Sequence, residues 1–141
     1  MSSIRVLVVE DFAPFWQFIR STLAKRPELQ VIGEVTDGLE AVRRAQVLEP
    51  DLVLLDVGLP TLNGIEAARQ IRTLVPGSKI IFVSQESSPD VVHAALNVGA
   101  RGYVVKTSAA IDLLAAVEAV LDERQFVSVN RRFRSGPDTS P

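Results

Sequence analysis

The chain of 141 residues contains no cysteine and a single histidine. Without cysteine, the sequence excludes a disulfide framework, a thiolate and a cysteine-based zinc site, and it fits a reducing cytoplasm. The histidine, His93, has no partner ligand in the sequence, so we assign it to the surface of a helix. The function of the protein therefore does not depend on thiol or disulfide chemistry.

Long apolar runs and a targeting segment are also absent from the sequence. No apolar run approaches the roughly 18 residues that can span a bilayer. The N-terminus leads straight into a strand pattern and lacks the charged and apolar regions of a signal peptide. The formal net charge of -2 gives no general attraction to nucleic acid or to an anionic membrane. We expect a soluble cytoplasmic protein with no membrane partner.

Length and composition predict one folded domain followed by a tail. The chain is 47% hydrophobic, which allows a sizeable core but leaves no room for a second domain. After Gln125 the character changes to a short apolar fragment and then to a polar segment with three arginines. We predict a domain over 1–125 and a linker or disordered tail over 126–141, with solvated arginines (Arg131, Arg132 and Arg134).

Strand and helix patterns alternate strictly through the predicted domain. Apolar, β-branched runs predict five strands at 4–9, 30–34, 52–56, 79–84 and 102–105. Helical spacing follows each strand, near 14–25, 37–48, 65–75, 90–98 and 108–121. Asp37 and Ser108 are candidate N-caps, Asn63 and Gly64 suggest a turn, and Gly99 suggests a helix end. This order predicts a doubly wound parallel α/β sheet with right-handed crossovers.

Polar side chains stand where four of these strands end. The run Leu52 to Leu55 is typical of a strand buried on both faces, and Asp56 follows it. Ligands and reacting groups collect beyond the carboxyl ends of parallel strands, so chemistry is expected at Asp56. Taken alone, this run is equally consistent with an aspartate whose only role is to begin the turn toward Pro60. The other strand ends favour the chemical interpretation (Glu10 and Asp11, Ser84, and Lys106).

Three acids, a hydroxyl and an ammonium would converge at one edge of the predicted sheet. Crowded carboxylates repel one another, and proteins tolerate them where a cation lies between them. Oxygen ligands with few protein carboxylates suit Mg²⁺, which often bridges to phosphate. This set matches phosphoryl transfer to an aspartate, with Asp56 attacking and with Lys106 and Ser84 holding phosphoryl oxygens beside the metal.

Several segments together resemble the receiver domain of two-component response regulators, the CheY-like family. They are Glu10-Asp11, LLDVGLP, Asn63-Gly64, VSQES and GARGYVVK, and the resemblance spans roughly residues 4–123. The segments ALNVGARGYVVKTSAA and FVS most resemble the NarL/FixJ/LuxR-type subfamily, which carries a helix-turn-helix output domain. The resemblance implies a flavodoxin-like, doubly wound five-stranded parallel sheet of order 2-1-3-4-5 with five helices.

The resemblance also implies roles for individual residues at the strand ends. Asp56 is similar to the residue that a sensor histidine kinase phosphorylates, and Lys106 to the lysine that pairs with the phosphoryl group. The residues similar to the Mg²⁺ ligands of the family are Glu10, Asp11 and Asp56, together with the backbone carbonyl of Gly58. The chain would then be a phosphoacceptor switch that catalyses only its own phosphorylation and dephosphorylation.

Two further residues resemble the switch of the family. Ser84 is similar to the hydroxyl that moves to meet the phosphoryl group, and Tyr103 to the aromatic that turns inward with it. A phosphoryl group adds about -1.5 to -2 charge and three acceptor oxygens, enough to bias a loop between two arrangements. The switching surface would comprise 90–98, 102–105 and the final helix. Transcription would be regulated through a DNA-binding output domain absent here. The resemblance leaves open a homodimer formed through the last helix or through the one before it.

The sequence departs from the family pattern in three ways. Gln85 follows the switch hydroxyl where the family has a small residue, which affects access to the phosphoryl group and its lifetime. Thr107 follows the lysine where the family has proline, so we expect a trans bond there. No output domain follows, so the chain either ends at a linker or acts through its receiver alone.

Three other functions are compatible with parts of this pattern. A phosphatase of the haloacid dehalogenase type needs a second aspartate where Gly58 stands. A flavin or dinucleotide protein needs a glycine-rich loop after the first strand, but residues 10–14 are acidic there. A degenerate receiver that only makes protein contacts is disfavoured by the full acid set and stays open because of Gln85.

Overall fold

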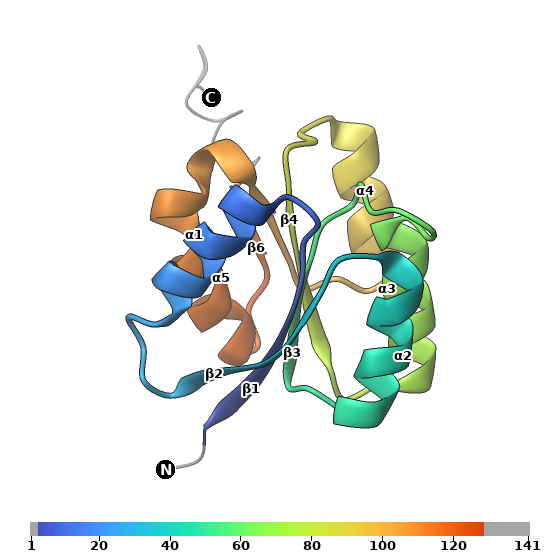
Figure 1. Ribbon diagram of the computed structural model, residues 1–141. Helices are drawn as coiled ribbons and strands as arrows, with labels where there is room; N and C mark the ends of the chain where they lie inside the picture. Colours follow the sequence, from blue (N-terminus) through green and yellow to red (C-terminus); the bar gives the residue numbers. More distant parts are fainter. Residues whose placement is uncertain (1–2, 129–141) are drawn as a thin grey trace.

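A parallel sheet lies between two layers of helices in the computed structural model, which describes residues 3–128 (Figure 1). The strand order is β2-β1-β3-β4-β5-β6, and every neighbouring pair is parallel. The strands are β1 (Ile4–Val9), β2 (Leu29–Val35), β3 (Leu52–Leu55), β4 (Lys79–Ser84), β5 (Gly102–Val105) and β6 (Phe126–Val127). The predicted order 2-1-3-4-5 is confirmed, with one strand added at the edge.

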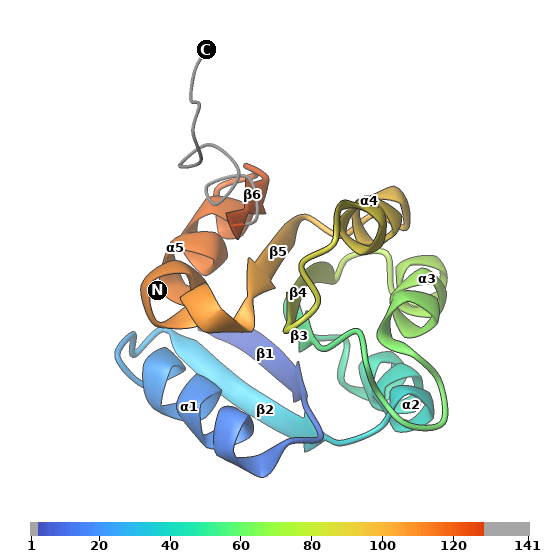
Figure 2. The same ribbon diagram turned by 90° about the horizontal axis from the view of Figure 1, so that it is seen from above.

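Two helices cover one face of the sheet and three cover the other (Figures 1 and 2). The first pair is α1 (Ala13–Leu23) and α5 (Ala109–Leu121). The opposite layer consists of α2 (Gly38–Leu48), α3 (Gly64–Leu74) and α4 (Pro89–Asn97). A single 3-10 turn, η1 (Lys106–Ser108), links β5 to α5. These five helices match the predicted number and order.

The strands are apolar throughout because both faces of the sheet are buried. Leu7 and Val9 of β1 belong to the core cluster that contains residues of α2, α3 and α4, whereas Val6 and Val8 belong to the cluster that contains residues of α1 and α5. All four residues of β3 are likewise buried. Apolar burial on two sides explains why these strands appear in the sequence as unbroken hydrophobic runs and not as alternating patterns.

The helix ends follow the sequence signals with one exception. Asp37 caps α2 by accepting the Glu40 N–H at 2.8 Å, and Asn63 caps α3 instead of forming a separate turn. Gly99, at φ 102°, follows the end of α4 as predicted. Ser108 occupies the predicted N-cap position of α5, but its side chain makes no capping hydrogen bond. It is the last residue of the 3-10 turn, and its backbone, at φ -106° and ψ 2°, lies outside the extended conformation of a capping residue.

A sixth strand was not predicted, and it forms within the segment assigned to a linker or tail. After α5 the chain reverses at Glu123, which has φ 64°, and its carboxylate pairs with Lys79 and Arg101. Phe126 and Val127 then pair with the first two residues of β5. A two-residue strand is too short to produce a recognisable apolar period. Residues 129–141 of the predicted tail, including its arginines, lie outside the described residues.

Ser128 fastens the end of this added strand to β5. Its hydroxyl accepts the backbone N–H of Val105 at 2.8 Å, and the side chain is buried. Val105 therefore has a hydrogen-bond partner on the side where the sheet would otherwise end. Within the described part of the chain, every helix is too short or too polar to cross a lipid bilayer.

Candidate functional site

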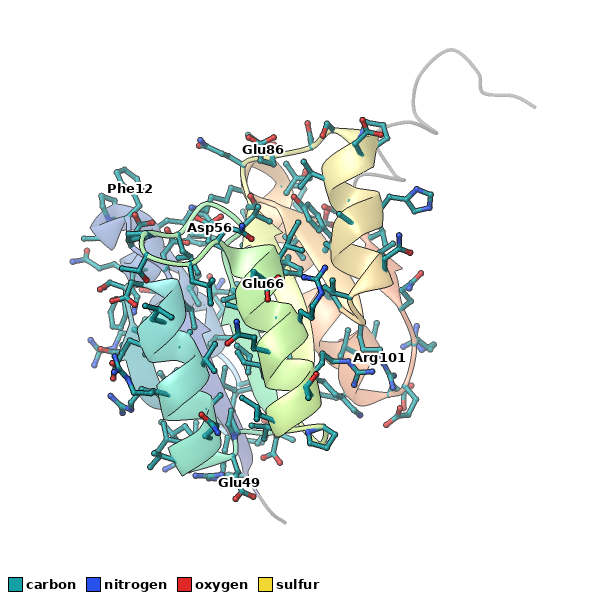
Figure 3. The ribbon with its side chains drawn as sticks, turned by 90° about the vertical axis from the view of Figure 1, so that its right-hand side faces the viewer. Phe12, Glu49, Asp56, Glu66, Glu86 and Arg101 are labelled. Carbon is teal, nitrogen blue, oxygen red and sulfur yellow. The ribbon has the colours of Figure 1, made fainter. Side chains whose placement is uncertain are left out.

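The carboxyl ends of four strands meet at one end of the molecule. Asp56 directly follows β3, Glu10 and Asp11 follow β1, Ser84 ends β4 and Lys106 follows β5. Figure 3 shows Asp56 at the same end as two neighbouring loop residues, Phe12 and Glu86, with Glu49 at the opposite end. The parallel topology thus brings together the strand-end residues singled out in the sequence.

Lys106 joins two of these strand ends through its ammonium group. Its Nζ lies 3.0 Å from Glu10 Oε2 and 3.0 Å from Asp56 Oδ2. The Glu10, Asp56 and Lys106 side chains are only 1%, 10% and 14% exposed. Burial acts to lower the pKa of Lys106, but its hydrogen bonds to the two carboxylates outweigh burial and raise the pKa above the usual lysine value. Lys106 is therefore a charged ammonium that crosslinks β1, β3 and β5.

The three acids form a cluster that suits a hard cation. Glu10, Asp11 and Asp56 each offer a carboxylate oxygen within 4.8 Å of the others. Glu10 Oε2 accepts the Phe12 N–H and Lys106, whereas its Oε1 is buried with no hydrogen-bond partner among the described residues. Burial raises the pKa of Glu10, opposed by these hydrogen bonds. A buried oxygen without a partner is costly, and a bound cation would satisfy it.

A cavity of about 400 Å³ opens beside Asp56. Its lining combines two of the three clustered acids, the ammonium and the hydroxyl with two aromatic rings from the loop and helix after β1. The lining residues are Asp11, Phe12, Phe15, Asp56, Gly58, Ser84, Gln85, Glu86 and Lys106. The Gly58 N–H donates to Asp56 Oδ1 at 3.3 Å. Gln85 lines this cavity and is exposed to solvent.

Ser84 and Tyr103 hold the loop between β4 and α4 from two sides. Ser84 Oγ accepts the Glu86 N–H at 3.2 Å, and the Tyr103 hydroxyl donates to the Glu86 carbonyl at 2.7 Å. Tyr103 is fully buried, with its ring centroid 6.0 Å from that of Phe82. Burial raises the pKa of Tyr103 to about 12. The inward aromatic and the strand-end hydroxyl therefore contact the same residue.

The family described as the response regulator receiver domain matches residues 6–118. The chain belongs to this family. A receiver domain is a signalling switch and not an ordinary enzyme, and the strand-end acids and the lysine of this chain lie together as described above.

Named relatives place this receiver in the LuxR/NarL type. LiaR, a transcriptional regulatory protein of Bacillus subtilis (strain 168), is 36% identical over 116 residues, covering 82% of this chain and 55% of LiaR. The crystal structure of a LuxR-family two-component response regulator from Aurantimonas sp. SI85-9A1 has a TM-score of 0.84, 33% identity and 89% coverage of both chains. The receiver domain of NarL from Mycobacterium tuberculosis has a TM-score of 0.78 and 30% identity, covering 86% of this chain and 96% of that one. The receiver thus spans little more than half of LiaR.

Two residues contribute to the receiver's site in ways that the sequence did not indicate. A Cβ at Gly64 would lie 1.9 Å from the backbone carbonyl oxygen of Asp56, so only glycine allows α3 to start this close. The ring of Phe15, on α1, has its centroid 4.6 Å from Lys106 Nζ. Spacing along α1 could not reveal this contact, because an apolar residue at this position also fits the helical stripe.

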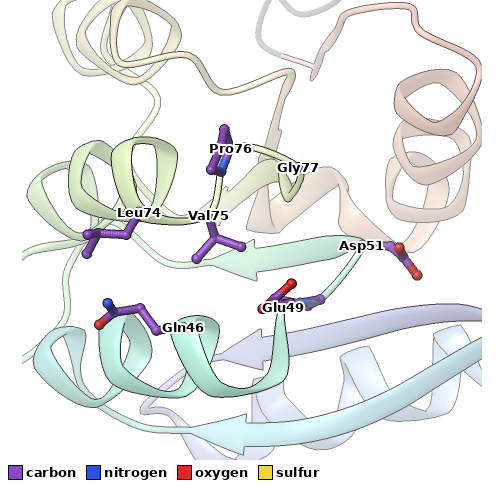
Figure 4. Close-up of a pocket in the computed structure, with 8 residues that line it drawn as sticks. Gln46, Glu49, Asp51, Leu74, Val75, Pro76 and Gly77 are labelled. Carbon is purple, nitrogen blue, oxygen red and sulfur yellow. The ribbon is translucent and has the colours of Figure 1, made fainter.

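Other predicted features of the receiver lie where the sequence suggested. The Lys106–Thr107 bond is trans, as expected, and His93 is exposed on α4. A hollow of about 500 Å³ lies at the other end of the sheet, before β3 (Figure 4). It is lined by Gln46, Glu49, Pro50, Asp51, Leu74, Val75, Pro76 and Gly77. This hollow holds no cluster of acids with an ammonium, so it is not the candidate site.

Proposed function

We propose that this receiver is a phosphoacceptor switch in which Asp56 takes a phosphoryl group from a sensor histidine kinase. The supporting observation is the placement of the Asp56 carboxylate in a cavity, between two other acids and the ammonium of Lys106. In the transfer, a bond forms between an Asp56 oxygen and phosphorus, and the bond from phosphorus to the kinase histidine breaks. Asp11 and Glu86 also line this cavity, but among its lining carboxylates it is Asp56 that accepts the hydrogen bond from Lys106.

The acid cluster would bind Mg²⁺ during this transfer. Glu10, Asp11 and Asp56 would supply carboxylate oxygens, and the backbone carbonyl of Gly58 would complete the protein ligands. When bound, the ion neutralises charge on the phosphoryl oxygens. The unpaired Glu10 Oε1 supports this assignment, because the buried oxygen would otherwise lack a partner among the described residues.

Lys106 and Ser84 would hold the phosphoryl oxygens that the metal ion leaves free. Lys106 Nζ lies 3.0 Å from Asp56 Oδ2, so a phosphoryl group on Asp56 would lie beside this ammonium group. Ser84 would have to turn its hydroxyl from the Glu86 N–H toward the phosphoryl group. This turn would loosen the loop that Tyr103 also holds, and so alter α4 and β5.

The altered surface would act on a partner in the cell. We propose that α4, β5 and α5 change their contacts with an output domain or with a second copy of the chain. LiaR is a transcriptional regulatory protein, and this receiver covers about half of it. We therefore propose transcription regulation as the process that the switch controls, with DNA contacted through a separate output domain.

Phosphorylation is tested by intact mass measurement after incubation with Mg²⁺ and acetyl phosphate. The wild type should gain one phosphoryl group, and Asp56→Asn should gain none. Fluorine NMR with beryllofluoride should show a bound signal that the same variant loses. A wild-type protein that is folded yet forms neither adduct would overturn the proposal. The receiver would then be a module that makes protein contacts without being phosphorylated. Gln85, which is exposed and lines the cavity, would be the first residue to replace.

Metal binding is tested separately through Trp16, the only tryptophan in the chain. Trp16 lines a hollow of about 320 Å³ together with Glu10, Asp11 and Glu34. Mg²⁺ should change its fluorescence in the wild type and in Glu34→Gln, which lies outside the acid cluster. Asp11→Asn should weaken the response by tenfold or more, and an unchanged affinity in this variant would contradict the ligand assignment.

A further inference from the structure

Lys106 has a third contact besides its two carboxylate partners. An ammonium group carries three N–H donors. Two of them are used on Glu10 and Asp56, and the structure gives the third no oxygen acceptor among the described residues. The neighbour on the remaining side is the ring of Phe15, whose centroid is 4.6 Å from Nζ. A cation this close to an aromatic face is attracted by the ring quadrupole.

The ring of Phe15 is held in place by its own surroundings. Phe15 lies in the first turn of α1, where its N–H donates to the Phe12 carbonyl at 3.0 Å. Its ring lies 5.2 Å from that of Phe18 and packs on the core cluster between the sheet, α1 and α5. One side of Phe15 is therefore anchored in the core, while the side chain also lines the cavity beside Asp56.

The carboxylates that hold Lys106 are the same ones that would bind a divalent cation. Glu10 and Asp56 belong to the acid cluster, so a bound cation would draw their negative charge away from the ammonium. The cation would also repel the ammonium directly. A neutral aromatic ring does not compete for the metal, and its attraction for Lys106 persists when the acids are occupied.

We propose that Phe15 is a positioning residue whose ring keeps the Lys106 ammonium directed at Asp56 while a divalent cation occupies the acid cluster. This inference rests on the proposed phosphoacceptor function and assigns a residue to it that the strand-end pattern does not contain. Phe15 is not one of the acids that would bind the metal, and in this proposal it acts only through Lys106.

The test compares Phe15→Leu, which removes the ring, with Phe15→Tyr, which keeps it. Phe18→Leu is the matched control, since Phe18 packs against the same cluster but does not line the cavity. The spectroscopic measurement is the ring-current shift of the Lys106 side-chain methylene protons, assigned with Lys106→Arg. We expect an upfield shift that survives Mg²⁺ addition in the wild type, Phe15→Tyr and Phe18→Leu, and that is lost in Phe15→Leu.

Phosphorylation kinetics supply the second measurement. At saturating Mg²⁺ and acetyl phosphate, the maximal rate of Phe15→Leu should fall about threefold to tenfold, the range expected for one partly buried cation–π contact. The rate should recover in Phe15→Tyr, and the Mg²⁺ affinity should hold in all variants. If Mg²⁺ abolishes the wild-type shift, or if Phe15→Leu reacts as fast as the wild type, the positioning role is refuted while the phosphoacceptor function stands. If the wild type forms no adduct, the phosphoacceptor function fails, and the spectra alone decide whether the ring holds Lys106.

Discussion

Tyr103 donates a hydrogen bond of 2.7 Å from its buried hydroxyl to the backbone carbonyl of Glu86. Ser84, which lines the Asp56 cavity, accepts the N–H of the same residue. One loop residue thus connects the strand-end hydroxyl of β4 with an aromatic side chain on β5. If Ser84 moves, its single hydrogen bond to the Glu86 N–H breaks. This disturbs the same loop residue whose carbonyl Tyr103 contacts.

The ionisation of Tyr103 should be delayed in the folded protein. It is the only tyrosine, so phenolate absorbance reports on this residue alone. Burial raises its pKa from 10.0 to about 12, so we expect a folded-state midpoint near 12 and a normal midpoint in urea. The unfolding free energy should be unaffected by this group below pH 10.0 and should fall as the pH rises through about 12. Coincident midpoints in folded and unfolded protein would show that the hydroxyl is not buried.

Removing the Lys106 ammonium should destabilise the protein, because two buried carboxylates would lose their partner. We expect Lys106→Met to lower the unfolding free energy by about 3 kcal/mol in urea without metal. Mg²⁺ should restore part of the lost unfolding free energy by binding the two carboxylates. A second substitution, Glu10→Gln, should also restore part of it. Lys79→Met removes a surface pair with Glu123 and should have a much smaller effect. Equal losses in the two lysine variants would mean that the buried pair carries no special weight.

Gly64 should be intolerant of any side chain, because α3 begins against the backbone of Asp56. In Gly64→Ala, the added Cβ would overlap the Asp56 carbonyl, and the unfolding free energy should fall by about 2 kcal/mol or more. Adduct formation at Asp56 should also slow as the chain shifts. Gly77→Ala is the control: a Cβ there meets nothing within 4 Å, so urea unfolding should be nearly unchanged. A stable Gly64→Ala protein would show that α3 can move away at little cost.

The contacts of β6 should contribute measurably to stability. Ser128→Ala removes the acceptor for the Val105 N–H, and we expect a loss of about 1 kcal/mol with faster hydrogen exchange at that amide. A chain that stops at Gln125 should lose more, because Phe126 and Val127 leave the sheet as well. If Val105 exchanges equally slowly in all of these, another group must protect it.

The sequence predicted most of the sheet because burial on both faces leaves a strong signal. The five longer strands were placed within one residue of their observed ends, and the polar residues at four of those ends do converge. Residue type and strand position were sufficient here, since parallel strands all end at the same edge.

The remaining features depend on contacts between distant parts of the chain. Phe126 and Val127 have no periodic pattern, and their place beside β5 follows from the reversal at Glu123. Ser108 is a residue type that is common at N-caps, but it lacks the backbone conformation of a cap. The 3-10 turn that ends at Ser108 determines this conformation. The need for Gly64 and the contact of Phe15 with Lys106 appear only when α3 and α1 are packed against the strand ends.

The two-residue strand β6 also determines how the receiver may safely be shortened. It pairs with β5, which would otherwise be the outermost strand of the sheet with its backbone groups exposed to other molecules. A chain that ends before Phe126 would expose the backbone groups of β5 at the edge of the sheet, and two such chains could pair through these edges. Dimers seen only with such trimmed material would then reflect the position of the cut and not the signalling state of the protein.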